Sequence, residues 1–69
     1  MKQYQVIIEH CRETGFFVGY IPGFAGAHSQ GETRGELMKN MREVVDMLLE
    51  DGDPMMESEF VGVEPLTVG

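Results

Sequence analysis

The sequence predicts a small α+β domain with the element order β-β-β-α-β. Two observations near the N-terminus indicate strands: apolar residues alternate with others over residues 4–9, and residues 16–21 are rich in aromatic and β-branched side chains. A third observation is a broad apolar stripe at helical spacing between residues 37 and 49. No repeat, linker or low-complexity tract interrupts the chain, so we expect one domain over residues 1–69.

The three N-terminal strands are each predicted from a different feature. In residues 4–9 one face is apolar, whereas residues 16–21 offer apolar side chains on both faces and so fit a central strand. Residues 21–24, Ile-Pro-Gly-Phe, fit a type II turn, with proline at its second position and glycine where φ must be positive. Residues 26–30 form a weak third strand, whose small side chains suit an edge.

The helix has a clear start signal. Thr33 and Glu36 form a capping box, in which the Thr33 hydroxyl accepts from the Glu36 N–H and the Glu36 carboxylate accepts from the Thr33 N–H. The following apolar positions are 37, 38, 41, 44, 45, 48 and 49. With Pro54 preventing continuation, the helix is about 24 Å long, enough to cover a sheet of four strands.

A last strand is expected at Phe60, Val61 and Val63, before Pro65. The first three strands have short loops and should form an antiparallel meander, and the helix can act as the right-handed crossover to a parallel fourth strand. One sheet face then receives the helix and the other stays uncovered. The apolar residues of the second strand on the uncovered face are either Phe17 and Ile21, or Phe16, Val18 and Tyr20; such a face indicates an interface.

The size of the chain also favours association. A core in a domain of 69 residues rarely contributes more than about 3–5 kcal/mol of net stability. Cys11 is the single cysteine, so no internal disulfide can form, and His10 and His28 do not complete a zinc site, so no metal is expected. We therefore expect a partner chain or self-association as a homodimer or homotetramer.

The net charge of −7 lies entirely in the last third of the chain. Residues 1–43 contain five acidic and five basic side chains, whereas residues 44–69 contain seven acidic side chains and neither Lys nor Arg. Nucleic-acid binding needs clustered Lys and Arg, so it is not expected. The acidic side chains would attract a basic partner, or would keep a small protein soluble; composition alone leaves both interpretations open.

The remaining function classes are disfavoured by what the sequence lacks. No apolar run approaches the ~20 residues that span a bilayer and no export signal is visible, so a cytoplasmic protein with no membrane contact is expected. Metal-dependent phosphodiester cleavage needs several converging carboxylates, but the first strand supplies only Glu9 and the second supplies none. We expect no enzyme activity, no catalytic residues and no cofactor.

The stretch from Gly15 to Thr33, GFFVGYIPGFAGAHSQGET, resembles the signature of HicB-like antitoxins. That signature has an aromatic strand, a proline-glycine loop, a run such as Gln30-Gly31-Glu32-Thr33, and an amphipathic helix with an early asparagine, here Asn40. The likeness extends from Tyr4 to Val63, and it departs from the family at Gly23 and Gly35, where acidic residues are usual.

The resemblance implies a partial ribonuclease-H-like fold with strand order 3-2-1-4. It also implies that the protein neutralises HicA, a small basic mRNA endoribonuclease toxin, by direct binding. Many family members carry an additional DNA-binding domain; since the sequence ends directly after its last expected strand, no separate DNA-binding domain is expected here.

Six residues are candidate partner contacts by their position in this motif: Tyr20, Pro22, Phe24, His28, Gln30 and Glu59. The loop from Pro22 to Gly26 could display Phe24 to a partner, or its glycines could serve only the geometry of the turn. His28 could contact a partner, or it could be a surface residue. The alternative to an antitoxin is an orphan, stand-alone oligomeric protein of the same fold with a regulatory or ligand-binding role.

Overall fold

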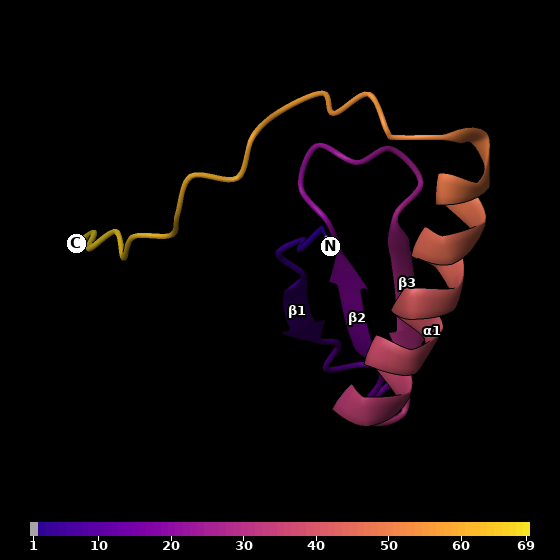
Figure 1. The fold of residues 1–69 in the computed structure, drawn as a ribbon. Coiled ribbons are helices and arrows are strands. Elements are labelled where there is room, and N and C mark those ends of the chain that lie inside the picture. Colours follow the sequence, from indigo (N-terminus) through magenta and orange to yellow (C-terminus); the bar gives the residue numbers. More distant parts are fainter. Residues whose placement is uncertain (1) are drawn as a thin grey trace.

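A computed structural model describes residues 2–69 of the chain. The elements are strands β1 (Ile7–His10), β2 (Phe17–Tyr20) and β3 (His28–Gly31), helix α1 (Arg34–Leu48) and a 3₁₀ turn, η1 (Leu49–Asp51). The strands form one antiparallel sheet in the order β1-β2-β3, and α1 covers one face of it (Figure 1). The predicted α+β class, the three-strand meander and the helix are confirmed.

The predictions of a fourth strand near the C-terminus and of the strand order 3-2-1-4 are wrong. Residues 60–69 are in no helix or strand, and the segment extends away from the sheet (Figure 1). The physical reason lies just upstream, where the Glu57 N–H donates to the carbonyl of Gly23 at 2.7 Å. This bond holds the returning chain on the loop after β2, and residues 61–69 beyond it are exposed and pair with no strand.

The loop from Pro22 to Gly26 contains two consecutive tight turns. The Phe24 N–H donates to the Ile21 carbonyl, and the Ala27 N–H donates to the Phe24 carbonyl, each at 3.1 Å. Gly23 and Gly26 occupy the third positions of these turns with φ of 80° and 83°, which side chains rarely adopt. The type II turn predicted at residues 21–24 is confirmed.

Helix α1 begins at the predicted cap, with one difference in the hydrogen bonds. The Glu36 N–H donates to the Thr33 hydroxyl at 3.0 Å, as expected. The Glu36 carboxylate, however, accepts from the N–H of Glu32 at 3.1 Å, one residue before the predicted donor Thr33. The carboxylate therefore also orders the residue that joins β3 to the helix.

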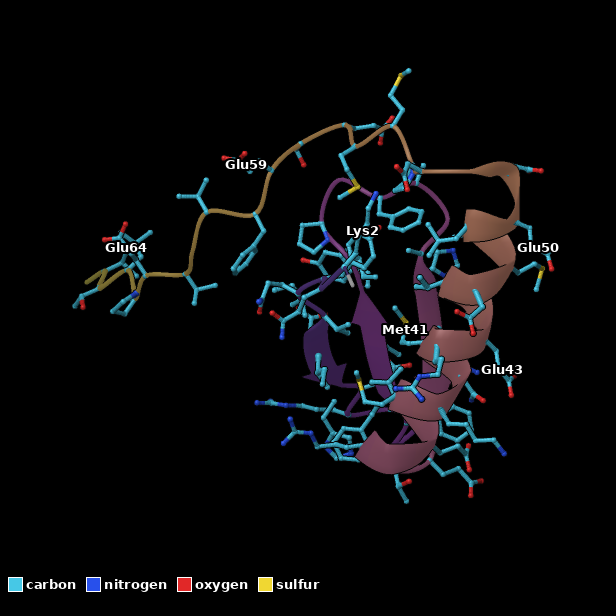
Figure 2. All side chains as sticks on the ribbon, viewed as in Figure 1. Lys2, Met41, Glu43, Glu50, Glu59 and Glu64 are labelled. Carbon is cyan, nitrogen blue, oxygen red and sulfur yellow. The ribbon has the colours of Figure 1, made fainter. Side chains whose placement is uncertain are left out.

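The core lies between α1 and the sheet. Its buried members are Ile21, Phe24, Ala27, Leu37 and Met41. In Figure 2 Met41 lies where the helix meets the sheet. Full burial of a side chain the size of Leu37, Met41 or Phe24 contributes about 1.5–3 kcal/mol, and partly buried residues of both layers pack around these.

Candidate binding surface

The sheet face opposite α1 is the candidate binding surface. Its orientation follows from Gly19 in β2, because a Cβ added there would lie 3.2 Å from the Leu37 side chain of the helix. Gly19 therefore faces α1, and its neighbours Val18 and Tyr20 point to the other side. The sequence left two alternatives open for the uncovered face. Phe17 and Ile21 pack against the core, so the alternative that places Val18 and Tyr20 on the uncovered face is confirmed.

Two cross-strand rows make up this helix-free face. Ile7, Tyr20 and His28 are paired across the three strands, and Glu9, Val18 and Gln30 form the next row. Directly opposed side chains in a sheet lie in contact distance of each other. We use the name helix-free face for these six residues.

Three of the six candidate contacts lie together on this face. Tyr20 is 45% exposed, and the side chains of His28 and Gln30 are also exposed. Ile7 and Val18 are half-buried beside them. The sequence predicted Val18 in one of its two alternatives for this face, but it did not single out Ile7, which is paired with Tyr20. An exposed tyrosine next to aliphatic and polar side chains is typical of a protein interface.

Two further candidates, Pro22 and Glu59, lie at the end of the sheet where β2 enters its loop. Both line an open hollow of about 410 Å³, together with residues of the N-terminal segment such as Tyr4 and Gln5. The Tyr4 hydroxyl is buried without a hydrogen-bond partner in the described part of the chain. Pro22 and Glu59 are therefore separate from the helix-free face, in a hollow whose lining also includes the core residue Ile21.

The prediction that the loop displays Phe24 is wrong. Phe24 is only 7% exposed and belongs to the core, where its ring lies 5.5 Å from the ring of Tyr4. The reason is the pair of turns around it, which direct the side chain at the centre of the loop inward. Phe24 therefore supports the N-terminal segment and the loop, and it does not belong to the exposed surface.

The acidic last third is exposed. All seven acidic residues between positions 44 and 69 have exposed side chains: Asp46, Glu50, Asp51, Asp53, Glu57, Glu59 and Glu64. Glu50 lies on η1 at the end of α1, and Glu59 and Glu64 lie on the extended segment (Figure 2). Asp53 forms an ion pair with Lys2, which raises the pKa of the Lys2 ammonium group. The other acidic groups give this end of the molecule a negative surface.

The single cysteine lies at the end of the β1–β2 hairpin. Hydrogen bonds from the Thr14 hydroxyl and from the backbone of Thr14 and Glu13 lower the pKa of the Cys11 thiol. Within residues 2–69, no three His, Cys, Asp or Glu side chains come together in a way that could hold a metal ion. In the same residues no helix has the length and apolar character needed to cross a membrane.

Taken together, the fold and the surface define a small α+β module with one sheet face and one acidic end open to solvent. Its similarity to a UPF0150 protein of Synechocystis is 39% identity over 67 residues, covering 97% of this chain and 96% of the relative. UPF0150 proteins of Thermotoga maritima and Archaeoglobus fulgidus are 35% and 30% identical, covering 97% and 96% of this chain and 91% and 94% of those proteins. The chain belongs to the UPF0150 family. No family model matches the chain, and no solved structure matches it.

Proposed function

We propose that this protein is an antitoxin-like binding module that neutralises a small basic HicA-type mRNA endoribonuclease by direct binding. The observation that carries the proposal is the helix-free face, on which Tyr20, His28 and Gln30 lie together in an exposed patch. Half-buried Ile7 and Val18 supply apolar area between the polar groups. A partner that covers this patch would bury aromatic surface and would satisfy polar groups at its margin.

Charge supports a basic partner for this module. The exposed acidic groups of residues 44–69, from the end of α1 through η1 to the extended segment, produce a negative field, and these residues contain no Lys or Arg to offset it. Such a field accelerates association with a cationic protein and orients it, and salt weakens the effect. The likeness of residues 15–33 to HicB-like antitoxins supports the choice of a ribonuclease toxin as that partner.

The proposal is tested by a titration of RNA cleavage. A purified HicA-type ribonuclease is incubated with an mRNA substrate and increasing amounts of this protein, at low and at high salt. We expect cleavage to stop near a stoichiometric ratio, with a weaker effect at high salt. Undiminished cleavage at a large excess of this protein at low salt would exclude the proposed activity.

A second candidate function is a stand-alone oligomeric regulator, because the extended segment exposes apolar side chains that nothing in residues 2–69 covers. Val61 and Val63 are 89% and 82% exposed. A stable homo-oligomer that neither binds nor inhibits the ribonuclease would favour this candidate. Inhibition of cleavage by the oligomer would favour the antitoxin.

A further inference from the structure

The open hollow at the end of the sheet has a lining that suits one kind of ligand. Three segments form it: the N-terminal segment, the start of the loop after β2 and the segment that follows η1. Its volume of about 410 Å³ lies in the range of ~300–1,000 Å³ that is typical of ligand pockets, so it can hold a small molecule or one long side chain of a partner. The apolar lining consists of Tyr4, Ile21, Pro22, Met56 and Phe60, and the polar lining consists of Gln3, Gln5, Ser58 and Glu59.

Contacts within the chain hold these three segments together. The Glu57 N–H donates to the Gly23 carbonyl at 2.7 Å, and a Cβ at Gly23 would lie 2.2 Å from the Ser58 carbonyl oxygen, so the last segment runs directly against the loop. The Tyr4 ring lies 5.5 Å from the ring of the buried Phe24, which anchors the N-terminal segment on the same loop. The walls of the hollow are thus in place before a ligand binds, and this lowers the cost of ordering them.

The lining has a negatively charged residue and no positively charged one. Glu59 lines the hollow with its side chain exposed, and the lining contains neither Lys nor Arg. Lys2, the basic residue of the N-terminal segment, is already engaged in the ion pair with Asp53. Glu57 and Glu64, on the same segment as Glu59, are also exposed. The hollow therefore favours a cationic ligand, and the neighbouring carboxylates increase the attraction.

The aromatic residues of the lining select among cations. Tyr4 and Phe60 line the hollow and are half-buried, so both are accessible to a ligand. A guanidinium group is planar, stacks on an aromatic ring and donates two hydrogen bonds to one carboxylate, whereas the lysine ammonium group is a compact, strongly hydrated charge. The side-chain oxygens of Gln3 and Gln5 offer further acceptors for the remaining N–H donors. This combination suits arginine better than lysine.

We infer that this hollow binds an arginine side chain of a partner protein, with the guanidinium group against Tyr4 and Phe60 and paired with the Glu59 carboxylate. The inference rests on the proposed function, because the basic ribonuclease is the protein that would supply the arginine. The hollow and the helix-free face are separate, but Tyr20 on the face and Pro22 in the hollow are two residues apart in the chain. One partner can therefore cover the face and insert an arginine at its end.

Substitution of Glu59 tests whether the contact is local. Binding of the HicA-type ribonuclease to the full chain is measured by isothermal titration calorimetry. We expect Glu59→Gln, which keeps the size of the side chain, to raise the dissociation constant by about tenfold or more, since the guanidinium group loses its ionic partner. The matched control, Glu64→Gln, removes the same charge from the same exposed segment outside the hollow and should stay within about threefold of the wild type. Equal dissociation constants for the two variants would overturn the inference and leave the proposed function in place.

A titration with small arginine and lysine derivatives tests the hollow without the ribonuclease. Backbone amide signals of the isotope-labelled full chain are followed by NMR as N-acetyl-L-arginine amide or N-acetyl-L-lysine amide is added. We expect the arginine derivative to shift the signals of Gln5, Ser58 and Phe60, with smaller shifts for the lysine derivative and no shifts in Glu59→Gln. These shifts together with a ribonuclease that does not bind would contradict the proposed function but not the arginine site. Absent shifts, or equal shifts with both derivatives, would overturn the inference.

Discussion

At the scale of single residues, glycines determine how closely the elements approach. A Cβ at Gly31 would lie 2.6 Å from the backbone nitrogen of Leu37 and 3.0 Å from its Cα, so α1 can pass over the end of β3 only above a glycine. The family motif led us to note Gly31, but spacing in the sequence does not show a contact between backbones. At Gly35 an added Cβ would meet only the Thr33 hydroxyl at 4.0 Å.

These two glycines provide a matched pair of substitutions. Gly31→Ala should lower the free energy of unfolding by about 1–3 kcal/mol, because the helix must shift to admit the methyl group. Gly35→Ala should raise it by up to about 1 kcal/mol through better helix propensity in the first turn of α1. Urea denaturation followed by circular dichroism measures both. Equal effects of the two changes would show that close packing at Gly31 is unimportant.

The thiol of Cys11 gives a pH-dependent prediction at the same scale. Its pKa is lowered by the Thr14 hydroxyl, so the thiolate is favoured in the folded protein. The associated stability is fully present above the unfolded thiol pKa of 9.0 and is lost as the pH falls through the lower folded value. Thr14→Val should move the midpoint of thiol alkylation against pH upward. A midpoint that does not change would remove Thr14 as the cause.

At the scale of elements, the sequence predicted each strand of the meander and the start of the helix within a few residues. The first strand was predicted from alternating apolar side chains, the second from its aromatic and β-branched residues, and the helix from its cap and apolar stripe. All of these are local signals. The predicted fourth strand at residues 60–64 had a local signal of the same kind. A strand forms, however, only where the fold brings the segment beside another strand. The Glu57 N–H bonds to the Gly23 carbonyl, residues 61–69 beyond it are exposed, and no pattern in the sequence reveals such a bond.

Asn40 joins α1 to β3, and its loss should be measurable. Asn40→Ala leaves the Gln30 carbonyl without its 2.8 Å hydrogen bond and should lower the free energy of unfolding by about 1 kcal/mol. Lys39→Ala is the control on the exposed side of the same helix and should change stability by less than about 0.5 kcal/mol. Chemical denaturation compares the two variants. If Asn40→Ala is as stable as Lys39→Ala, the bond does not hold the helix on the sheet.

At the scale of the whole molecule, the single helix covers one sheet face and leaves the other for a partner. The sequence predicted an uncovered face and proposed Tyr20, His28 and Gln30 as contacts, but it could not decide which side chains of β2 lie there. Gly19 decides this, because a Cβ there would lie 3.2 Å from the Leu37 side chain, which places this side of β2 under α1. Phe24 was assigned to the surface because the loop sequence does not show that two successive turns direct its ring inward.

The central claim is that a basic ribonuclease toxin binds the helix-free face, and isothermal titration calorimetry with that toxin tests it most directly. The double variant Tyr20→Ala with His28→Ala changes this face, whereas Met38→Ala with Lys39→Ala changes exposed positions on α1. We predict that the first variant raises the dissociation constant by about tenfold or more and that the second leaves it within about threefold of the wild-type value. Wild-type affinity in the first variant, with binding lost in the second, would place the partner on the helix and contradict the account.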